Sequence, residues 1–134
     1  MACLRSNLIF HPLNTAYKQS ELSFFLEDAQ PSLFICEKQI YESISSLELL
    51  LKPENIYTLS SDENKSIHQI KREGDHEPVA CSKDDTAALL YSSGTTGQPK
   101  GIMLSHENIE SNAIALKEAW NFNKEDSLLH ALPI

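Results

Sequence analysis

The chain has 134 residues, of which 41% are hydrophobic, and this suits one modest globular domain. Its 19 acidic and 11 basic residues give a formal net charge of −8, which argues against a nucleic-acid or anionic membrane surface as partner. Three widely spaced cysteines predict no disulfide framework, and no apolar run approaches the roughly 20 residues of a membrane span. We therefore expect a setting in the cytoplasm or an organelle interior, the mitochondrion included.

The first element that the residues predict is a helix that begins near Ser20. Serine is a good N-cap residue, and Pro31 lies just beyond the expected helix end. The apolar face of this helix would consist of Leu22, Phe25, Leu26 and Ala29. The run Leu-Phe-Ile-Cys at 33–36 then predicts a short buried strand of a parallel sheet.

The middle of the chain predicts a second helix, a strand and a long polar loop. Apolar residues recur at helical spacing over 39–51, Pro53 follows them, and 55–60 predicts a strand. Residues 61–85 are polar and mixed in charge, so we expect a loop with one short helical turn near 67–72. The histidines and cysteine of this loop match no common zinc spacing, so no metal site is expected.

Two strands and a helix are predicted around a glycine-rich stretch. Residues 84–91 form an apolar run typical of a buried strand, and 102–104 predict a second short strand. Ser105 can then cap a helix, with Glu107 in its first turn and His106 in a capping and packing role. The helix would carry one apolar stripe for core packing, formed by Ile109, Ala113, Leu116 and Trp120.

Residues 91–101 read Tyr-Ser-Ser-Gly-Thr-Thr-Gly-Gln-Pro-Lys-Gly and hold three of the four glycines of the chain. Glycine permits bends that bring backbone N–H groups and hydroxyls onto phosphate oxygens, and a lysine adds a point charge. The stretch therefore predicts a triphosphate-binding loop, with a plain surface turn as the alternative. It is not a Walker A loop, because Pro99 precedes the lysine and Gly101 follows it. The glycine spacing also differs from the Rossmann fingerprint.

The stretch does resemble the signature loop of the adenylate-forming superfamily, which holds acyl-CoA synthetases, luciferases and adenylation domains of peptide synthetases. Every position from Tyr91 to Gly101 fits the pattern Tyr-(Thr/Ser)-Ser-Gly-Thr-Thr-Gly-x-Pro-Lys-Gly. Residues 3–36 resemble an earlier region of the same enzymes, in which a strand ends in Pro-Leu-Asn-Thr, here at 12–15. That strand, the helix near 20–29 and the strand at 33–36 would form one βαβ step. Within the superfamily, the amino-acid sequence of residues 2–33 is most similar to that of malonyl-CoA synthetases.

The resemblance implies ATP, Mg²⁺ and coenzyme A as ligands and a carboxylic acid as substrate. An acyl-adenylate would form with release of pyrophosphate, and the thiol of coenzyme A would then displace AMP. Lys100 would neutralise the leaving pyrophosphate, while Pro99 stiffens the exit from the loop. The phosphate-binding residues would be Ser92, Ser93, Gly94, Thr95, Thr96, Gly97 and Lys100.

The resemblance also implies an α/β fold, namely part of a layered αβα domain with βαβ units, truncated at both ends. Residues 1–134 would be a fragment of the AMP-binding N-terminal domain. The catalytic residues of the family belong to later segments, so none is assigned here and the isolated chain is expected to be inactive. Two alternatives stay open: a fragment of a peptide-synthetase adenylation domain, and a non-catalytic remnant.

Overall fold

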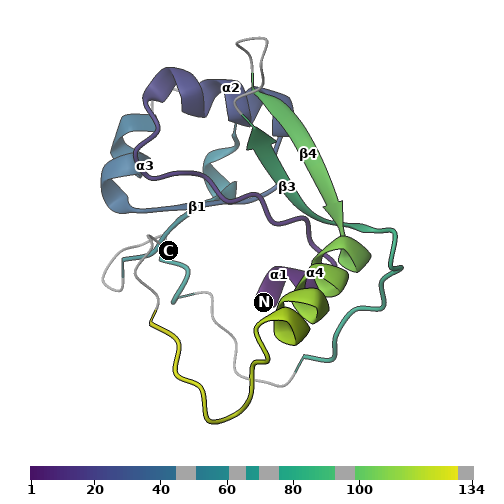
Figure 1. The fold of residues 1–134 in the computed structure, drawn as a ribbon. Helices are drawn as coiled ribbons and strands as arrows, with labels where there is room; N and C mark the ends of the chain where they lie inside the picture. The colour runs from purple at the N-terminus through teal and green to yellow at the C-terminus, as the bar shows by residue number, and fades with distance from the viewer. Residues whose placement is uncertain (45–50, 61–65, 70–75, 93–98, 130–134) are drawn as a thin grey trace. The chain divides into compact units, whose positions relative to one another are not determined.

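The computed structural model describes residues 1–44, 51–60, 66–69, 76–92 and 99–129 and shows a mixed α/β chain (Figure 1). The chain divides into two compact units, Leu13–Asp75 and a unit formed by Met1–Pro12 with His76–Ile134. The predicted α/β class is therefore confirmed. In chain order the elements are α1 (Ala2–Arg5), α2 (Gln19–Ala29), β1 (Phe34–Cys36), α3 (Lys38–Ile44), the 3-10 turn η2 (Pro53–Asn55), β2 (Ile56–Thr58), β3 (Thr86–Ser92), β4 (Lys100–Ser105) and α4 (His106–Ala119).

The N-cap of helix α2 lies two residues earlier than the sequence predicts. Lys18 is its N-cap, and the Glu21 side chain accepts a hydrogen bond from the Lys18 backbone N–H at 2.8 Å. The predicted Ser20 cap is wrong, because a glutamate three residues after Lys18 supplies the capping contact and Ser20 lies inside the helix. The helix ends at Gln30, which is left-handed with φ 43°, since the following proline disfavours a further helical residue.

Strands β1 and β2 form a parallel pair joined through α3. Phe34 pairs with Ile56 and Cys36 with Thr58, so this unit has the βαβ connection. The helix and strand predicted at 39–51 and 55–60 are thus present as α3 and β2, although residues 45–50 lie outside the described part. Phe10, from the strand predicted before α2, forms an isolated bridge with Ala88. The βαβ connection that the structure shows runs across α3.

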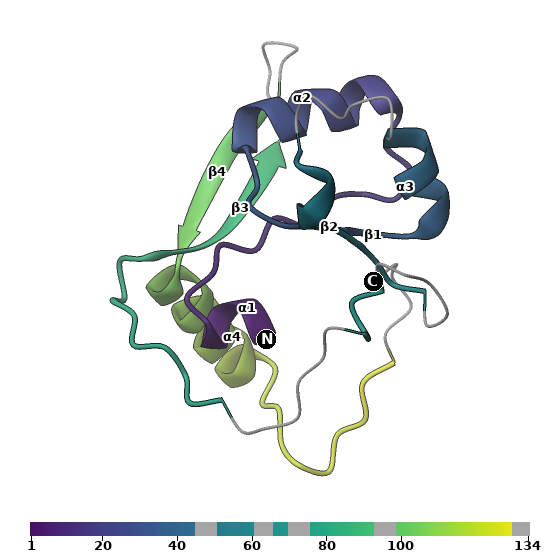
Figure 2. The same cartoon turned by 180° about the vertical axis from the view of Figure 1, so that it is seen from behind.

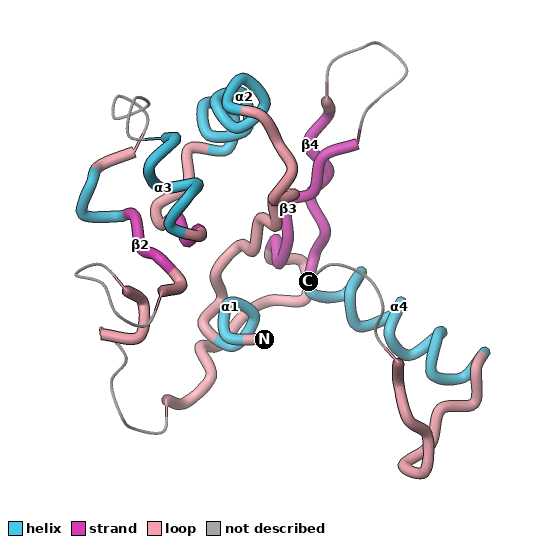
Figure 3. Tube along the Cα trace, turned by 90° about the vertical axis from the view of Figure 1, so that its left-hand side faces the viewer, coloured by secondary structure: helices cyan, strands magenta, loops and turns pink. Residues whose placement is uncertain are grey.

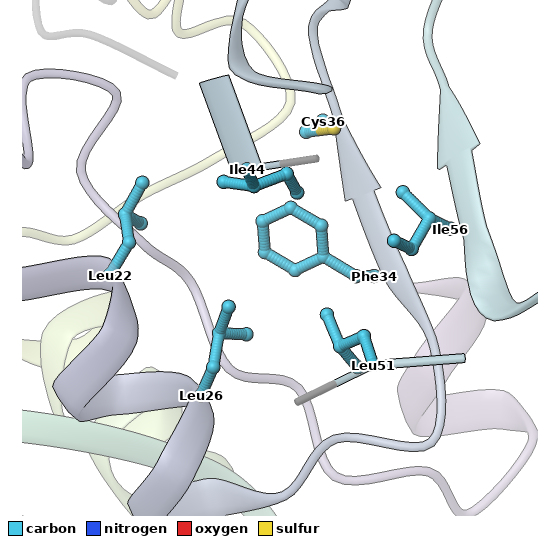
Figure 4. Close-up of a cluster of buried hydrophobic side chains, with 7 residues drawn as sticks. All are labelled: Leu22, Leu26, Phe34, Cys36, Ile44, Leu51 and Ile56. Carbon is cyan, nitrogen blue, oxygen red and sulfur yellow. The ribbon is translucent and has the colours of Figure 1, made fainter. Parts of the chain in front are cut away.

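The core of the Leu13–Asp75 unit gathers side chains from α2, β1, α3 and β2 (Figure 4). Leu22 and Leu26 lie one helical turn apart on α2, so both reach the same cluster. The other members of the cluster are Phe34, Cys36, Ile44, Leu51 and Ile56. Burial raises the pKa of the Cys36 thiol to about 11, with a further contribution from the negative charge of Glu37.

In the other unit, β3 and β4 form an antiparallel hairpin that leads directly into α4 (Figure 2). The strand predicted at 84–91 is present, but it begins at Thr86 and only its first half is buried. Ala87 and Ala88 are in the core, whereas Leu90 is 36% exposed. A register irregularity between Thr86 and Ala88 marks the start of the pairing.

Helix α4 has the predicted cap but not the predicted burial. The Ser105 hydroxyl accepts from the Asn108 N–H at 3.2 Å, and the Asn108 side chain accepts from the Ser105 N–H at 3.0 Å. The prediction that the apolar stripe packs in a core is wrong for the described residues, since Leu116 is 37% and Trp120 65% exposed. Periodicity decides which face of a helix is apolar, whereas burial also requires a neighbouring layer.

Candidate phosphate-binding site

The pairing of β3 with β4 brings the two ends of the predicted phosphate loop together. Ser92 is the last residue of β3, Lys100 is the first of β4, and the register places them opposite each other. Figure 3 shows the two strands side by side. Lys100 is exposed and Ser92 is half-buried, so the ammonium group can reach a ligand in solvent.

The structure thus places two of the seven predicted site residues, Ser92 and Lys100, at facing positions. The other five, Ser93, Gly94, Thr95, Thr96 and Gly97, lie outside the described residues. A loop closed by a paired residue at each end has its ends fixed by the ladder, which lowers the entropy lost when the loop orders around a ligand. The hairpin is therefore a suitable scaffold for an anion-binding loop.

The next pair along the hairpin is Tyr91 with Gly101. Side chains two residues apart on a strand share a face, and Leu89 accordingly lies on the same face as Tyr91. A Cβ atom at Gly101 would lie 3.4 Å from Leu89 Cδ1 and 3.6 Å from Tyr91 Cε1. These are ordinary van der Waals distances, so a methyl group would fit at position 101, whereas a larger side chain would meet Leu89 and Tyr91.

His11 reaches the same face from the N-terminal segment. Its Nδ1 atom lies 2.9 Å from the Leu89 carbonyl oxygen, and its ring centroid lies 5.2 Å from that of Tyr91 at an interplanar angle of 50°. Sequence reasoning missed this residue. His11 is 78 positions away from Leu89, and no local periodicity or spacing signals a contact over that distance.

The N-terminus of α4 is occupied by main-chain partners at the opposite end of β4. The His106 N–H donates to the Asp85 carbonyl oxygen at 3.1 Å, and the Glu107 N–H donates to that of Lys83 at 3.0 Å. The Lys83 ammonium also lies 4.0 Å from the Glu107 carboxylate. These contacts occupy the first backbone N–H groups of α4, whose N-cap is Ser105, and they leave the Ser92 and Lys100 end of the hairpin as the candidate anion site.

Other kinds of site find no support in the described part of the chain. Within 1–44, 51–60, 66–69, 76–92 and 99–129, no three His, Cys, Asp or Glu side chains are grouped so that they could hold a metal ion. No helix in those ranges is long and apolar enough to cross a bilayer. All three cysteines are described, and each is a free thiol.

Known proteins share both the sequence pattern and the fold. The family description "AMP-binding enzyme" matches residues 1–134. The mitochondrial malonate–CoA ligase ACSF3 of Xenopus laevis is 36% identical over 131 residues, which are 96% of this chain and 22% of that protein. A dimodular nonribosomal peptide synthase of Bacillus subtilis is 30% identical over 96% of this chain and 5% of its own length.

Among solved structures, ATP-bound MatB from Rhodopseudomonas palustris superimposes with a TM-score of 0.84 at 36% identity, covering 98% of this chain and 26% of MatB. The chain thus spans 22% of the frog ligase and 26% of MatB. The family match runs over every residue, and the fold match over nearly all of them. The resemblance noted in the phosphate loop therefore extends through both units, and the chain belongs to the AMP-binding enzyme family.

Proposed function

We propose that this chain is the phosphate-binding segment of an ATP-dependent acid–thiol ligase. The observation that carries the proposal is the pairing of Ser92 with Lys100, which closes a glycine-rich, hydroxyl-rich loop with a cation at its exit. Residues 1–134 would form part of the AMP-binding N-terminal domain, with 61–85 as a polar loop and 91–101 as the phosphate loop. ATP as ligand is supported by the ATP-bound state of MatB, the similar structure.

In the proposed reaction a carboxylate oxygen of the acid attacks the α-phosphorus of ATP. The bond to the β-phosphate oxygen breaks, so that acyl-adenylate and pyrophosphate form, and the thiolate of coenzyme A then displaces AMP. Negative charge grows on the leaving pyrophosphate in the first step, and positively charged or N–H groups directed at those oxygens lower the barrier. Lys100 would supply the charge and Ser92 a hydroxyl, while bound Mg²⁺ would neutralise further phosphate charge.

The remaining loop residues have proposed roles that follow from their chemistry. The hydroxyls of Ser93, Thr95 and Thr96 would donate to the β- and γ-phosphate oxygens. Gly94 and Gly97 would permit the bends that direct backbone N–H groups at the same oxygens. The loop would thus hold the phosphates by many short contacts rather than by charge alone.

Malonate is the acid that we propose, because the similar ligase from Xenopus laevis is described as a malonate–CoA ligase. The mitochondrial description of that ligase also supports an organelle interior as the setting. A second candidate is an amino-acid-activating domain of a peptide synthetase, favoured by the 30% identity to the Bacillus subtilis synthase. The two differ in the acceptor: coenzyme A takes the acyl group in the first, and a carrier-protein thiol in the second.

A titration of the purified chain with MgATP tests the phosphate site. Lys100→Ala should weaken binding by about tenfold or more, because a charge-assisted contact to phosphate contributes about 1.5–3 kcal/mol. Lys124→Ala is the matched control, since the Lys124 side chain is 90% exposed and lies 3.9 Å from the Glu125 carboxylate, away from the loop in sequence. Equal weakening by both substitutions would refute the assignment of Lys100.

The same preparation should make no acyl-CoA from malonate, ATP and coenzyme A. The family resemblance places the adenine, ribose, magnesium and catalytic-lysine contacts in other segments, so the chain alone would bind phosphate without completing adenylation. Mass spectrometry of the reaction mixture measures the thioester directly. Detection of malonyl-CoA would show that these 134 residues are sufficient for the reaction.

A further inference from the structure

Pro12 interrupts a parallel pairing that Phe10 begins. The Phe10 N–H donates to the Ala87 carbonyl at 3.0 Å, and the Leu89 N–H donates to the Phe10 carbonyl at 3.0 Å. In a parallel ladder the next donor on the N-terminal segment is two residues further on, at position 12, and its acceptor is the carbonyl of Leu89. Proline has no N–H group, so the backbone cannot supply this bond.

The side chain of His11 takes the place of the missing backbone donor. Its Nδ1 lies 2.9 Å from the Leu89 carbonyl oxygen, and a carbonyl oxygen only accepts, so Nδ1 carries the hydrogen. A half-buried carbonyl left without a donor is destabilising, so this bond extends the pairing of β3 one step beyond Phe10. The extension reaches the part of β3 that directly precedes the phosphate loop.

The same imidazole contacts Tyr91, the residue before Ser92. The ring centroids are 5.2 Å apart and the planes are tilted by 50°, within the range in which aromatic rings attract each other. Leu89 and Tyr91 are the side chains that a Cβ atom at Gly101, on the partner strand, would contact. His11 therefore holds the backbone of Leu89 by one atom and the side chain of Tyr91 by its ring.

We propose that His11 is a positioning residue for the phosphate loop, an inference that rests on the phosphate-binding function proposed above. By fixing Leu89 and Tyr91, it fixes the direction in which β3 delivers Ser92 opposite Lys100. His11 acts through Tyr91 and the strand, without touching the nucleotide. Loss of His11 should therefore loosen the end of β3 that carries Leu89, Tyr91 and Ser92 and, as a consequence, reduce the affinity for MgATP.

Three substitutions separate the two contacts of His11. His11→Ala removes both the donor and the ring. In His11→Asn the amide nitrogen lies the same number of bonds from Cβ as Nδ1, so the donor is kept and the ring is lost. His11→Phe keeps a ring and loses the donor. His76→Ala is the matched control, because His76 is exposed in the same compact unit and its contact with Arg5 is made by the backbone carbonyl oxygen, which the substitution keeps.

Amide hydrogen exchange without nucleotide is the first measurement. In His11→Ala, exchange over residues 86–92 should become faster, while exchange over α4 in the same unit stays unchanged and shows that this unit is folded. His11→Asn should restore part of the protection, and His76→Ala should leave it unaltered. Unchanged exchange over 86–92 in His11→Ala would overturn the proposal, whether or not the chain binds nucleotide.

Titration with MgATP and with magnesium tripolyphosphate is the second measurement. His11→Ala should bind both about fivefold more weakly, the effect of losing one net hydrogen bond at the loop base, and His11→Asn should recover most of the affinity. Faster exchange without any loss of affinity would show that His11 supports the strand but does not position the loop. If the unsubstituted chain binds neither ligand, the phosphate-binding function fails, and hydrogen exchange still decides whether His11 holds the hairpin.

Discussion

Substitution of Gly101 provides a test of how the hairpin is packed. Gly101 lies within β4 and pairs with Tyr91, and a Cβ atom there would meet Leu89 Cδ1 at 3.4 Å and Tyr91 Cε1 at 3.6 Å. These are ordinary carbon–carbon contact distances, so Gly101→Ala requires little movement. Alanine also lowers the entropy of the unfolded chain, and we expect the free energy of unfolding to rise by roughly 0.5 kcal/mol.

Gly101→Val should have the opposite effect. The two γ-methyl groups of valine extend about 1.5 Å beyond Cβ and occupy two of the three staggered positions. With carbons already at 3.4 and 3.6 Å, a methyl directed at Leu89 or Tyr91 would overlap with it, so one of these side chains must move. Overpacking of this kind costs about 1–3 kcal/mol of unfolding free energy. Where the side chain that moves is Tyr91, the residue before Ser92 is displaced.

Urea unfolding followed by the fluorescence of Trp120 measures both variants. Trp120 is the single tryptophan and lies in the same compact unit as the hairpin, so its signal reports on that unit. The expected order of stability is Gly101→Ala, then the unsubstituted chain, then Gly101→Val. A valine variant as stable as the alanine variant would show that Leu89 and Tyr91 do not limit the size of the side chain at position 101, and this account of the packing would have to be abandoned.

Two further predictions concern the helix cap and the buried thiol. Ser105→Ala removes the acceptor of the Asn108 N–H and should lower the stability of α4 by about 1 kcal/mol in urea unfolding; Ser105→Asp, which keeps an acceptor, should not. The pKa of Cys36 is raised from 9.0 to about 11 chiefly by burial, so alkylation at pH 8 in the folded state should label the exposed Cys81 and spare Cys36. The protonated thiol is favoured in the folded state, so this contribution to stability is complete below about pH 9 and is lost as the pH rises to about 11. Equal labelling of the two thiols in the folded chain, or no loss of stability between these pH values, would contradict the burial of Cys36.

The sequence predicts strands β3 and β4 well because their signals are local. An apolar run, a stretch rich in glycine and hydroxyl residues, and a second short apolar run lie within about twenty residues, and a hairpin is the simplest connection between two such strands. Ser105 as the N-cap of α4 is also read correctly, because capping depends on neighbours only three residues apart. The pairing of Ser92 with Lys100 follows from these local features once the two strands are joined.

Two predictions are wrong because residue type and periodicity do not identify the contacting partner. The apolar stripe of α4 is predicted to pack in a core, yet Trp120 is 65% exposed, because periodicity carries no information about which layer covers a face. The cap of α2 is predicted at Ser20 from residue type, but the Glu21 carboxylate accepts from the Lys18 N–H, and this local pair places the N-cap two residues earlier.

Pro12 shows how the meaning of a residue depends on its pairing partner. Taken locally, the proline begins a loop, and the histidine before it has no evident role. Once Phe10 is paired with Ala88, a parallel ladder requires the N–H of residue 12 to donate to the Leu89 carbonyl oxygen. Pro12 has no N–H group, so the backbone cannot form this hydrogen bond. The imidazole of His11 then replaces a backbone N–H, and because it also contacts Tyr91, a local defect in strand pairing connects the N-terminal segment to the phosphate loop.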